Sequence, residues 1–531
     1  MLIQEIEYRN TNSFSKLLVN YTGNGEEFRK LINNFPDINS FENQINLKSK
    51  NYNNKFRKVL IDVISNNYND EYLSNIQKDN ISKLRLKNTF TVTTGHQLNL
   101  LTGPIYFIYK IITVINLCEK LKNKYPKYNF IPIYWLASED HDFEEINHFF
   151  TNDKKFKWNT NQSGAVGDFN LKSIKNVIED YTKQIKNSTF YDDLVKIIDK
   201  AYLSSSNLSE ATISIVNSLF GCYGLLSIDA NNRKLKSIFC EILKKELEYN
   251  IVYDNSKLSI NNLKKSGYKI QANPRKINLF YLKDKKRERI LNDGNIFLTK
   301  SGEMSWSLNQ IKKEVDNYPE RFSPNVLFRP LFQEFILPNI CYIGGPSEVA
   351  YWLELKSVFD SQGITYPIIL NRNSVLIIEK NITKFLTKNK IDIELLFESE
   401  KFIKDTLLKK YSNLKLDFTE LKGQLKKQFL DLKKLSEKTD KSFNGALSAQ
   451  EKKQINGLNK LEKRLKKAEL KIHSDKIDKI IKIRNKIYFD GKPQERIINF
   501  TEFYKLHGPN FIKLLKDNLN PLNKKFSIIE L

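Results

Sequence analysis

Two short segments of the sequence concentrate side chains that could bind or transform a ligand. The first, "TGHQLNLLTGP" from Thr94 to Pro104, holds two glycines, a histidine and a glutamine. The second, "SEDHDFEEINH" from Ser138 to His148, holds five carboxylates and two histidines. Isolated charges are costly to bury unless they are paired or bound to something. So many ionisable groups directly after an apolar run therefore indicate a binding or catalytic site.

The acidic segment is compatible with several kinds of chemistry. Glu139 to Asp142 could position an amine, act as a general base or hold Mg²⁺. We expect Glu144, Glu145 and His148 on a helix, where spacings of three and four residues place them on one face. Zinc is a further option, although neither H-E-x-x-H nor H-x-x-E-H occurs. The alternative without chemistry is that these groups cap and solvate the start of a helix.

The first segment has the composition of an anion-binding loop. Gly95 and Gly103 allow tight turns and a close approach of the backbone to a ligand. A helix with Pro104 in its first turn would present unpaired N–H groups and a partial positive charge, with His96 and Gln97 beside them. The pattern is neither G-x-G-x-x-G nor a P-loop, so a plain strand-to-helix turn is the alternative.

Two later segments add arginines and a third glycine-containing turn. Arg329 could bind a carboxylate with two nitrogens, and Arg372 would be a second contact for an anion. Glu348 falls in the first turn of a predicted helix, where the helix dipole favours a carboxylate. The candidate residues here are Arg329, Gln333, Gly344, Gly345, Pro346, Glu348, Tyr351, Asn371, Arg372 and Ser374.

A parallel sheet would place all these segments at one edge. Apolar, β-branched runs alternate with helical patterns of 10–20 residues, which predicts βαβ units with right-handed crossovers. The predicted strands are 89–95, 129–138, 223–230, one that begins near Asn339 and ends before Gly344-Gly345-Pro346, and 366–370. Ligands of open α/β sheets bind beyond the carboxyl ends of the strands. We therefore expect the four polar loops to form one crevice for a ligand with anionic and cationic groups.

The patterns divide the chain into six parts. Residues 414–435 and 458–472 carry apolar residues spaced by three or four around the turn "KTDKSFNGALSAQ", which predicts an antiparallel helical hairpin with hydrophobic seams. Such an arm commonly supports dimerisation. The parts are a helical segment packed on the core (1–88), the first half of a Rossmann-like core (89–250), a connecting region with β-hairpins (251–325), the second half of the core (326–394), a coiled-coil arm (395–485) and a C-terminal segment returning to the core (486–531).

Composition and net charge limit the possible ligands and the cellular compartment of the protein. The 531 residues exceed what one core usually holds. The net charge of +25 suits anionic small substrates better than a nucleic acid, because lysine is spread evenly and arginine is scarce. The four cysteines lie far apart, which disfavours a disulfide framework or a thiolate zinc site and fits a reducing cytoplasm. No apolar window of about 20 residues and no signal-like start are present, so we expect neither a membrane span nor secretion.

Several of these motifs together resemble the bacillithiol synthase family, BshC. They are "TTGHQLNLLTGPIYFIYK", "IPIYWLASEDHDFEEINH", "RFSPNVLFRPLFQEFILPNICYIGGPSEVAYWLELKSVFD" and "ILNRNS", joined by the shorter "INLFYL" and "QERIINF". The family commonly has glutamine at the position of His96, which favours hydrogen bonding over catalysis there. It also commonly has P-R-x-S where this chain begins with Asn371.

The resemblance implies a ligase that joins the carboxyl group of cysteine to the amine of glucosaminyl-malate, the last step of bacillithiol biosynthesis. It implies a Rossmann-like core with a dimerising coiled-coil domain, and it leaves ATP or another adenine nucleotide, with Mg²⁺, as the co-substrate to be tested. Asp140, His141 and Asp142 would orient the amine, one of them as the base. Substrate contacts would come from Gly95, His96, Gln97, Gly103, Pro104, Glu139, Glu144, His148, Arg329, Gln333, Gly344, Gly345, Pro346, Glu348, Asn371, Arg372 and Ser374.

Three other functions stay open. The Rossmann-like core, helical arm and charge also fit an aminoacyl-tRNA-synthetase-like or RNA-binding protein, although H-I-G-H and K-M-S-K-S are missing. The cluster from Asp140 to His148 could serve a metal-dependent hydrolase. An interaction protein built on the coiled coil would leave the polar loops at the strand ends without a purpose.

Overall fold

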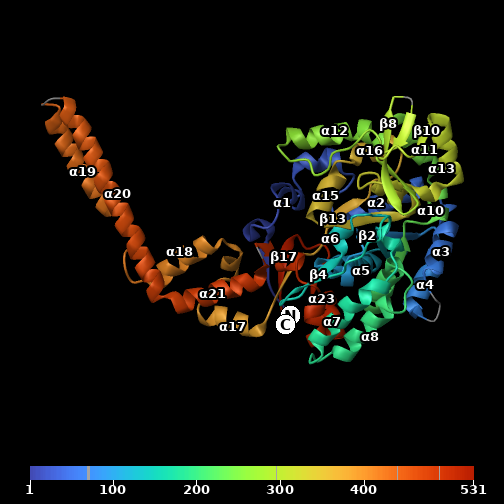
Figure 1. Ribbon diagram of the computed structural model, residues 1–531, viewed down its shortest axis with the longest axis horizontal. Helices are drawn as coiled ribbons and strands as arrows, with labels where there is room; N and C mark the ends of the chain where they lie inside the picture. The colour runs from blue at the N-terminus through green and yellow to red at the C-terminus, as the bar shows by residue number, and fades with distance from the viewer. Residues whose placement is uncertain (69–71, 295, 439–440, 490) are drawn as a thin grey trace. The chain divides into compact units, whose positions relative to one another are not determined.

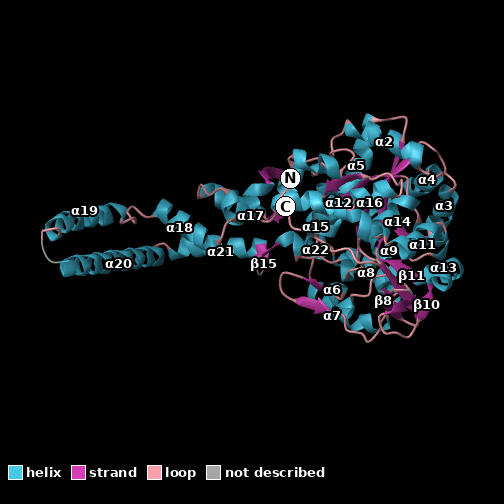
Figure 2. Cartoon of the chain, turned by 90° about the horizontal axis from the view of Figure 1, so that it is seen from above, coloured by secondary structure: helices cyan, strands magenta, loops and turns pink. Residues whose placement is uncertain are grey.

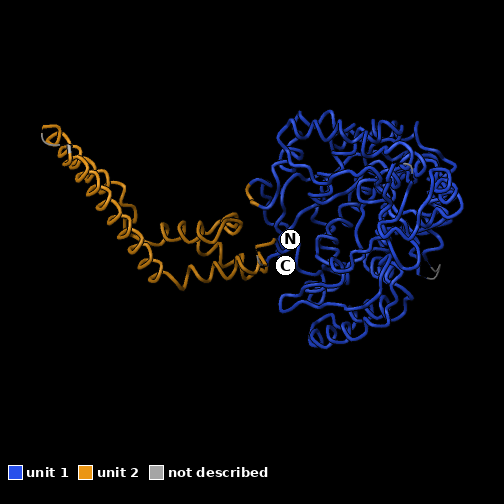
Figure 3. Tube along the Cα trace, turned by 45° about the horizontal axis from the view of Figure 1, so that its top comes forward, with its two compact units in different colours: residues 1–9, 13–378, 493–531 blue, residues 10–12, 379–492 orange. Residues whose placement is uncertain are grey.

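The computed structural model describes residues 1–68, 72–294, 296–438, 441–489 and 491–531. These residues form two compact units, which are coloured separately in Figure 3. Unit 1 comprises residues 1–9, 13–378 and 493–531, and unit 2 comprises residues 10–12 and 379–492. The candidate site lies entirely in unit 1.

A five-stranded parallel sheet forms the centre of unit 1 (Figure 1). Its strand order is β13-β12-β2-β3-β6, and every neighbouring pair is parallel. The strands are β2 (Thr89–His96), β3 (Asn129–Leu136), β6 (Leu226–Asp229), β12 (Asn339–Gly344) and β13 (Ile368–Asn371). All eight residues of β2 are buried, as expected for a strand covered on both faces. The predicted α/β, Rossmann-like core is thereby confirmed.

The strand order creates a switch point between β2 and β12. From β2 the chain moves outward through β3 to β6, whereas β12 pairs with the other side of β2 and β13 follows beyond it. Connections on the two sides of β2 therefore run in opposite directions. In open α/β sheets this is the place where loops part and a ligand can bind.

Three helices carry the residues that surround this switch point. Helix α5 (Tyr106–Lys124) connects β2 to β3, while α14 (Arg329–Ile336) precedes β12 and α15 (Pro346–Leu353) follows it.

The prediction that Pro104 lies in the first turn of a helix is wrong, because α5 begins two residues later. Pro104 instead forms an isolated β-bridge with Asn499. After β6, the chain forms two helices, α10 (Arg233–Ser237) and α11 (Cys240–Tyr249).

Within the described residues, unit 1 contains two further sheets of at least three strands. A five-stranded antiparallel sheet follows the order β10-β9-β8-β7-β11 and lies within residues 279–324. Its strands are β7 (Leu279–Lys283), β8 (Lys286–Asp293), β9 (Ile296–Thr299), β10 (Ser305–Ser307) and β11 (Phe322–Pro324). The second sheet pairs β1 (Leu2–Glu7) with β17 (Lys525–Glu530) and β17 with β14 (Val375–Ile378). Strand β1 was not predicted, because its partner lies at the opposite end of the chain.

Unit 2 is mainly helical (Figure 2). It contains α17 (Lys380–Lys388), α18 (Glu400–Tyr411), α19 (Thr419–Ser436), α20 (Lys441–Ile472) and α21 (Ser474–Ile487). Helices α19 and α20 form an antiparallel hairpin, since Lys422 pairs with Glu462 and Lys433 with Glu451. The predicted coiled-coil arm is confirmed. The predicted turn is shorter than expected: residues 441–450 are already helical, and Thr439 and Asp440 lie outside the described residues.

The seam of the hairpin agrees with the predicted one only in part. Phe429 is buried, and Ser436 donates a hydrogen bond across the hairpin to Asn444. These residues and the two ion pairs define the face of α19 that meets α20. Phe429 belongs to the predicted stripe, and Leu425 of the same stripe is half-buried. Three other leucines of that stripe are 40–59% exposed, namely Leu421, Leu432 and Leu435.

Candidate active site

An ion pair between a buried lysine and a half-buried glutamate stands at the switch point. Lys110 of α5 pairs with Glu348 in the first turn of α15, and its ammonium also donates to the carbonyl oxygen of Gly95 at 2.9 Å. Glu348 further accepts hydrogen bonds from the Tyr342 hydroxyl (2.6 Å) and from the N–H of Gly345 (2.8 Å). Burial alone raises the pKa of Glu348, but these three partners outweigh it and the pKa is lowered. The pair thus ties α5 and α15 to the ends of β2 and β12.

Arg329 adds a cation whose described partners are all neutral. One terminal nitrogen donates to Gln333 at 2.8 Å, and the other donates to the hydroxyls of Tyr351 at 3.0 Å and Tyr342 at 3.4 Å. The side chain is half-buried and forms no ion pair among the described residues. Because arginine stays protonated, this charge is available to an anion from outside the protein.

Glycine at position 95 makes room for this arginine. A Cβ atom on Gly95 would lie 3.4 Å from the Nη1 atom of Arg329 and 3.3 Å from the Tyr342 hydroxyl, both tighter than or at the limit of ordinary contacts. A Cβ atom on Gly345, the residue before α15, would lie 3.3 Å from the Glu348 carboxylate and 3.8 Å, an ordinary contact distance, from Nε of Arg372. Gly95 therefore allows the close approach of two protein side chains, and the predicted approach of a ligand to this backbone stays a prediction.

Arg372 is committed to a protein carboxylate. Its two terminal nitrogens donate to the two oxygens of Glu495 at 2.9 and 2.8 Å, and both side chains are 2% exposed. It also donates to the hydroxyl of Ser374 at 3.2 Å, and its guanidinium lies 5.0 Å from the ring centroid of Tyr106. Only Nε has no hydrogen-bond partner in the described structure. Asn371 donates its amide to the Tyr8 hydroxyl at 3.2 Å, so this loop is anchored to the N-terminal segment.

His96 ends β2 as a neutral ring. It is 9% exposed and packs against Tyr106 and Phe107. Burial, with the nearby cations Lys110 and Arg372, holds the pKa of His96 well below its ordinary range. Its buried Nε2 has no hydrogen-bond partner among the described residues. A neutral imidazole can donate or accept one hydrogen bond at this atom, which suits ligand contact more than acid catalysis.

The loop from β2 to α5 has an unusual backbone. Leu101, Thr102 and Gly103 follow one another with φ angles of 46°, 64° and 69°. Leucine and threonine rarely adopt such angles, and strain of this kind persists only when surrounding contacts impose it. Asn499 supplies those contacts: its amide donates to the carbonyls of Leu101 (2.8 Å) and Gly103 (2.6 Å).

A second polar cluster follows β3. The amide nitrogen of Gln97 donates to Asp140 at 2.8 Å and to Glu145 at 2.9 Å, so both carboxylates face one point. Arg287 of the antiparallel sheet lies 3.4 Å from Asp140 and donates to Nδ1 of His141 at 3.0 Å. Burial raises the pKa of Asp140, yet Gln97, Arg287 and His141 together lower it. Asp140 is therefore an ionised carboxylate at neutral pH.

The tautomer of His141 follows from its contact with Arg287. A guanidinium can only donate, so Nδ1 must be the acceptor and the ring proton is assigned to Nε2. His141 thus offers an N–H group, and its ring packs 5.6 Å from that of Phe280.

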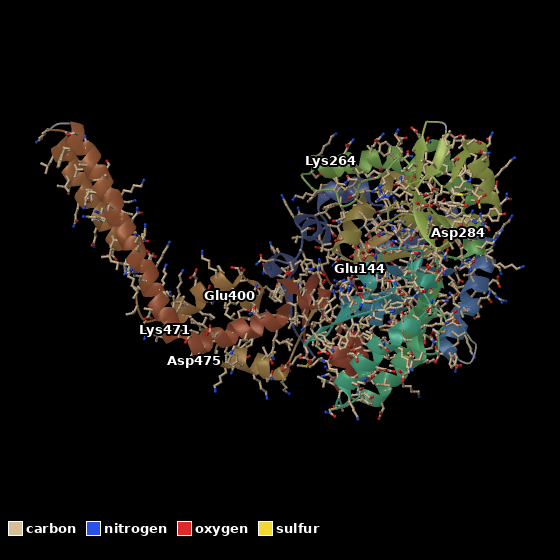
Figure 4. The ribbon with its side chains drawn as sticks, viewed as in Figure 1. Glu144, Lys264, Asp284, Glu400, Lys471 and Asp475 are labelled. Carbon is tan, nitrogen blue, oxygen red and sulfur yellow. The ribbon has the colours of Figure 1, made fainter. Side chains whose placement is uncertain are left out.

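Other acidic residues of the segment lie apart from this cluster. Glu139 is buried and pairs with Lys236, while Glu144, labelled in Figure 4, is exposed and pairs with Lys157 at 2.8 Å. Asp142 is exposed. The expected helix through His148 is wrong: α6 covers only Phe143–Ile146, and His148 begins strand β4 (His148–Phe150). Glu144 and His148 consequently do not share a helical face.

Three residues near these clusters were missed from the sequence. Lys110 is a single lysine in the apolar helix "YFIYKIITVINL", a pattern that could have marked it as buried. Arg287 and Glu495 come from the antiparallel sheet and from the C-terminal segment, far along the chain from their partners. Only the motif "QERIINF" pointed to the latter.

Comparison with known proteins assigns both parts of the chain to one protein family. Residues 1–373 match the family described as "Bacillithiol biosynthesis BshC, N-terminal Rossmann-like domain". Residues 375–531 match "Bacillithiol biosynthesis BshC, C-terminal coiled-coil domain". The chain belongs to the BshC family. The resemblance inferred from the motifs is confirmed.

Relatives of this family align over nearly the full length. A protein named "Putative cysteine ligase BshC" from Flavobacterium psychrophilum is 46% identical over 99% of both chains. One of the same name from Flavobacterium johnsoniae is 44% identical over 99% of both chains. A more distant one from Bacillus cereus is 29% identical over 85% of this chain and 86% of its own. These names agree with the prediction of a ligase.

Two further observations concern membranes and metals. Among the described residues, no helix is long and apolar enough to cross a membrane. Within the same part of the chain, no group of three or more histidine, cysteine, aspartate or glutamate residues is arranged to hold a metal ion.

Proposed function

We propose that this protein joins the carboxyl group of L-cysteine to the amine of glucosaminyl-malate, the last step of bacillithiol biosynthesis. Membership of the BshC family over the whole chain supports this proposal. The structural observation that supports it most is Arg329, a half-buried cation at the switch point with only neutral partners. Glucosaminyl-malate carries carboxylates that such a group would bind.

The two polar clusters match the two kinds of charge in the substrates. Arg329 would bind a carboxylate beside Gly95, and His96 would contribute a hydrogen bond at its free Nε2. Gln97, Asp140 and Glu145 would hold the amine, because their two carboxylates converge at one side of the loop. Asp140 would orient this amine as an ionised partner, since its lowered pKa makes it a weak base.

Amide formation also needs an activated carboxyl group. The amine nitrogen forms a bond to the carboxyl carbon, loses a proton, and displaces one carboxylate oxygen together with the group attached to it. We propose ATP or another adenine nucleotide as the co-substrate that supplies this group. Mg²⁺ would accompany its phosphates, as is usual for this ion. Arg287 lies 3.4 Å from Asp140, so its positive charge would repel a cation bound directly to that carboxylate.

The helical arm would mediate a homodimer. Leu421, Leu432 and Leu435 follow a spacing typical of a coiled-coil seam, yet they are 40–59% exposed on the single hairpin. An exposed apolar stripe next to the internal seam is suited to a second copy of the same hairpin. We propose that the protein acts in the cytoplasm, where its four free cysteines stay reduced.

Deletion of the gene tests the proposed reaction. Thiols and their precursors are measured in cell extracts by mass spectrometry, with the complemented strain as control. Loss of bacillithiol together with accumulation of glucosaminyl-malate is expected. Normal bacillithiol, or its loss without accumulation of that precursor, would contradict the proposed substrate and favour the synthetase-like alternative.

A further inference from the structure

A chain of buried polar groups leads from Arg329 away from the site. Arg329 donates to the side-chain oxygen of Gln333 at 2.8 Å, and the amide nitrogen of Gln333 donates to Glu334 at 2.9 Å. Glu334 also accepts a hydrogen bond from Asn339 at 2.7 Å. Lys48 of α2 (Ser40–Asn51) lies 3.7 Å from the other carboxylate oxygen and donates to the Glu334 carbonyl at 2.7 Å.

These groups are sealed from water and have no part in the reaction described above. Lys48 and Glu334 are each 1% exposed, and Gln333 and Asn339 are fully buried. A buried pair of charges rarely adds stability compared with apolar residues of the same size. The Lys48–Glu334 pair is connected to Arg329 through Gln333. We therefore look for a role of this pair that depends on the charge of Glu334.

The charge of Glu334 decides which way the Gln333 amide points. An ionised carboxylate can only accept, so it fixes the amide nitrogen of Gln333 on its own side. The amide oxygen is then left to face the guanidinium of Arg329. The reverse orientation would set an NH₂ group against that cation. The amide of Asn339 also points its nitrogen toward Glu334, because its oxygen accepts hydrogen bonds from the hydroxyls of Thr91 (3.2 Å) and Thr93 (2.9 Å).

We propose that Glu334 and Lys48 are positioning residues for the substrate carboxylate: Glu334 orients Gln333, which holds Arg329 without neutralising it. Burial raises the pKa of Glu334 to about 7, and Lys48 opposes this rise and favours the ionised carboxylate. A helix of the N-terminal segment thereby contributes to affinity at the sheet edge. This inference rests on the proposed function only in the identity of the carboxylate. A carboxylate in place of the Gln333 amide would hold Arg329 equally well but would neutralise its positive charge.

Calorimetric binding of L-malate and of glucosaminyl-malate, without nucleotide, tests this role. Glu334→Gln should bind both ligands about tenfold more weakly than the wild type, because the amide of Gln333 is no longer oriented. Gln333→Glu should bind them about 100-fold more weakly, since its carboxylate would pair with Arg329. Leu258→Lys, at a 64% exposed position of α12 (Ile251–Lys265), is the control and should bind as the wild type does.

A double variant separates positioning from folding. Lys48→Met should lower the melting temperature, because it leaves Glu334 buried without its cation. Lys48→Met combined with Glu334→Gln removes both charges and should recover most of the melting temperature while binding stays weak. A purely structural pair would instead show binding that recovers together with stability, and that result would overturn the inference.

The outcomes also distinguish this inference from the proposed function. Normal binding by Glu334→Gln would refute the positioning role even if the deletion strain accumulates glucosaminyl-malate. Conversely, L-malate binding that weakens in Glu334→Gln would support the positioning role even if the deletion strain has normal thiols. Failure of the wild-type protein to bind either ligand would overturn the inference.

Discussion

At the scale of single residues, the two arginines predicted as anion contacts have different surroundings. Both were predicted because a guanidinium group binds anions. In the structure, Arg372 pairs with the carboxylate of Glu495, whereas Arg329 donates hydrogen bonds to an amide and two phenols. Glu495 lies 123 positions from Arg372, so its pairing could not be read from local spacing. The residue types of the site were predictable; which of them already had partners was not.

Asp140 illustrates how such partners set a chemical role. Asp140→Asn would remove the charge while keeping a group that can accept from Gln97. Because a hydrogen bond to a charged group contributes about 1.5–3 kcal/mol, KM for glucosaminyl-malate should rise about 10-fold to 100-fold, with a smaller change in kcat. Steady-state kinetics measure this split, and Asp180→Asn at an exposed position of α7 (Lys175–Ile185) is the matched control. An unchanged KM in Asp140→Asn would remove the amine-binding role.

At the scale of elements, the strands were predicted more accurately than the segments that join them. Continuous apolar runs locate β2 and β3 because both faces of the sheet are covered. The helix start expected at Pro104 and the helix expected through His148 both failed, since long-range contacts decide these boundaries. Pro104 pairs with Asn499, and His148 joins a two-stranded sheet with Lys157.

The strained loop between β2 and α5 depends on one side chain. Asn499→Ala would leave the carbonyls of Leu101 and Gly103 without their donor, at a cost of about 2–4 kcal/mol for two buried acceptors. Asn499→Asp should be at least as unstable, because a carboxylate cannot donate. Thermal unfolding of both variants beside the exposed-site control Asn161→Ala measures the effect. A wild-type melting temperature for Asn499→Ala would show that other contacts hold the loop.

A buried carboxylate at the end of α15 makes stability depend on pH. Glu354 accepts from the N–H groups of Gln271 (2.6 Å) and Ala272 (3.3 Å), and burial raises its pKa to about 7. The folded state then binds its proton more tightly than the unfolded state does, so the free energy of unfolding falls as pH rises from about 4.5 to 7.

Glu354→Gln should remove this component of the pH dependence. The glutamine oxygen can still accept both N–H groups and has no charge to bury. Relative to the wild type, the variant should gain up to about 3 kcal/mol between pH 5 and pH 8. Urea unfolding at the two pH values measures the difference. An equal pH dependence of the two proteins would contradict the raised pKa.

At the scale of the whole molecule, periodicity predicted the helical arm but not the direction in which its leucines point. A spacing of three and four defines a stripe, and Phe429 of the predicted stripe in α19 is buried. Elsewhere the residues one position later, Lys422, Lys433 and Ser436, meet α20 instead. Two adjacent stripes on one helix cannot both face the same partner. The sequence alone could not tell the internal seam from a surface for another chain.

The exposed stripe allows a test of the proposed dimer. Leu421→Lys combined with Leu432→Lys should convert a dimer into a monomer, because the added charges would be buried in the interface between copies. The fold of each hairpin should persist, since both positions are exposed within it. Light scattering after size-exclusion chromatography measures the mass, with Leu258→Lys of unit 1 as control. A dimer that survives the double substitution would exclude this face.

The central claim is that Arg329 binds a substrate carboxylate during cysteine ligation. Its most direct test is complementation of the deletion strain with Arg329→Met, measuring the ratio of bacillithiol to glucosaminyl-malate in extracts. Arg85→Met, at an exposed position, is the control and should restore the wild-type ratio. We predict that Arg329→Met, at an equal protein level, leaves glucosaminyl-malate accumulated and bacillithiol at least tenfold below wild type. Full restoration by Arg329→Met would contradict the account.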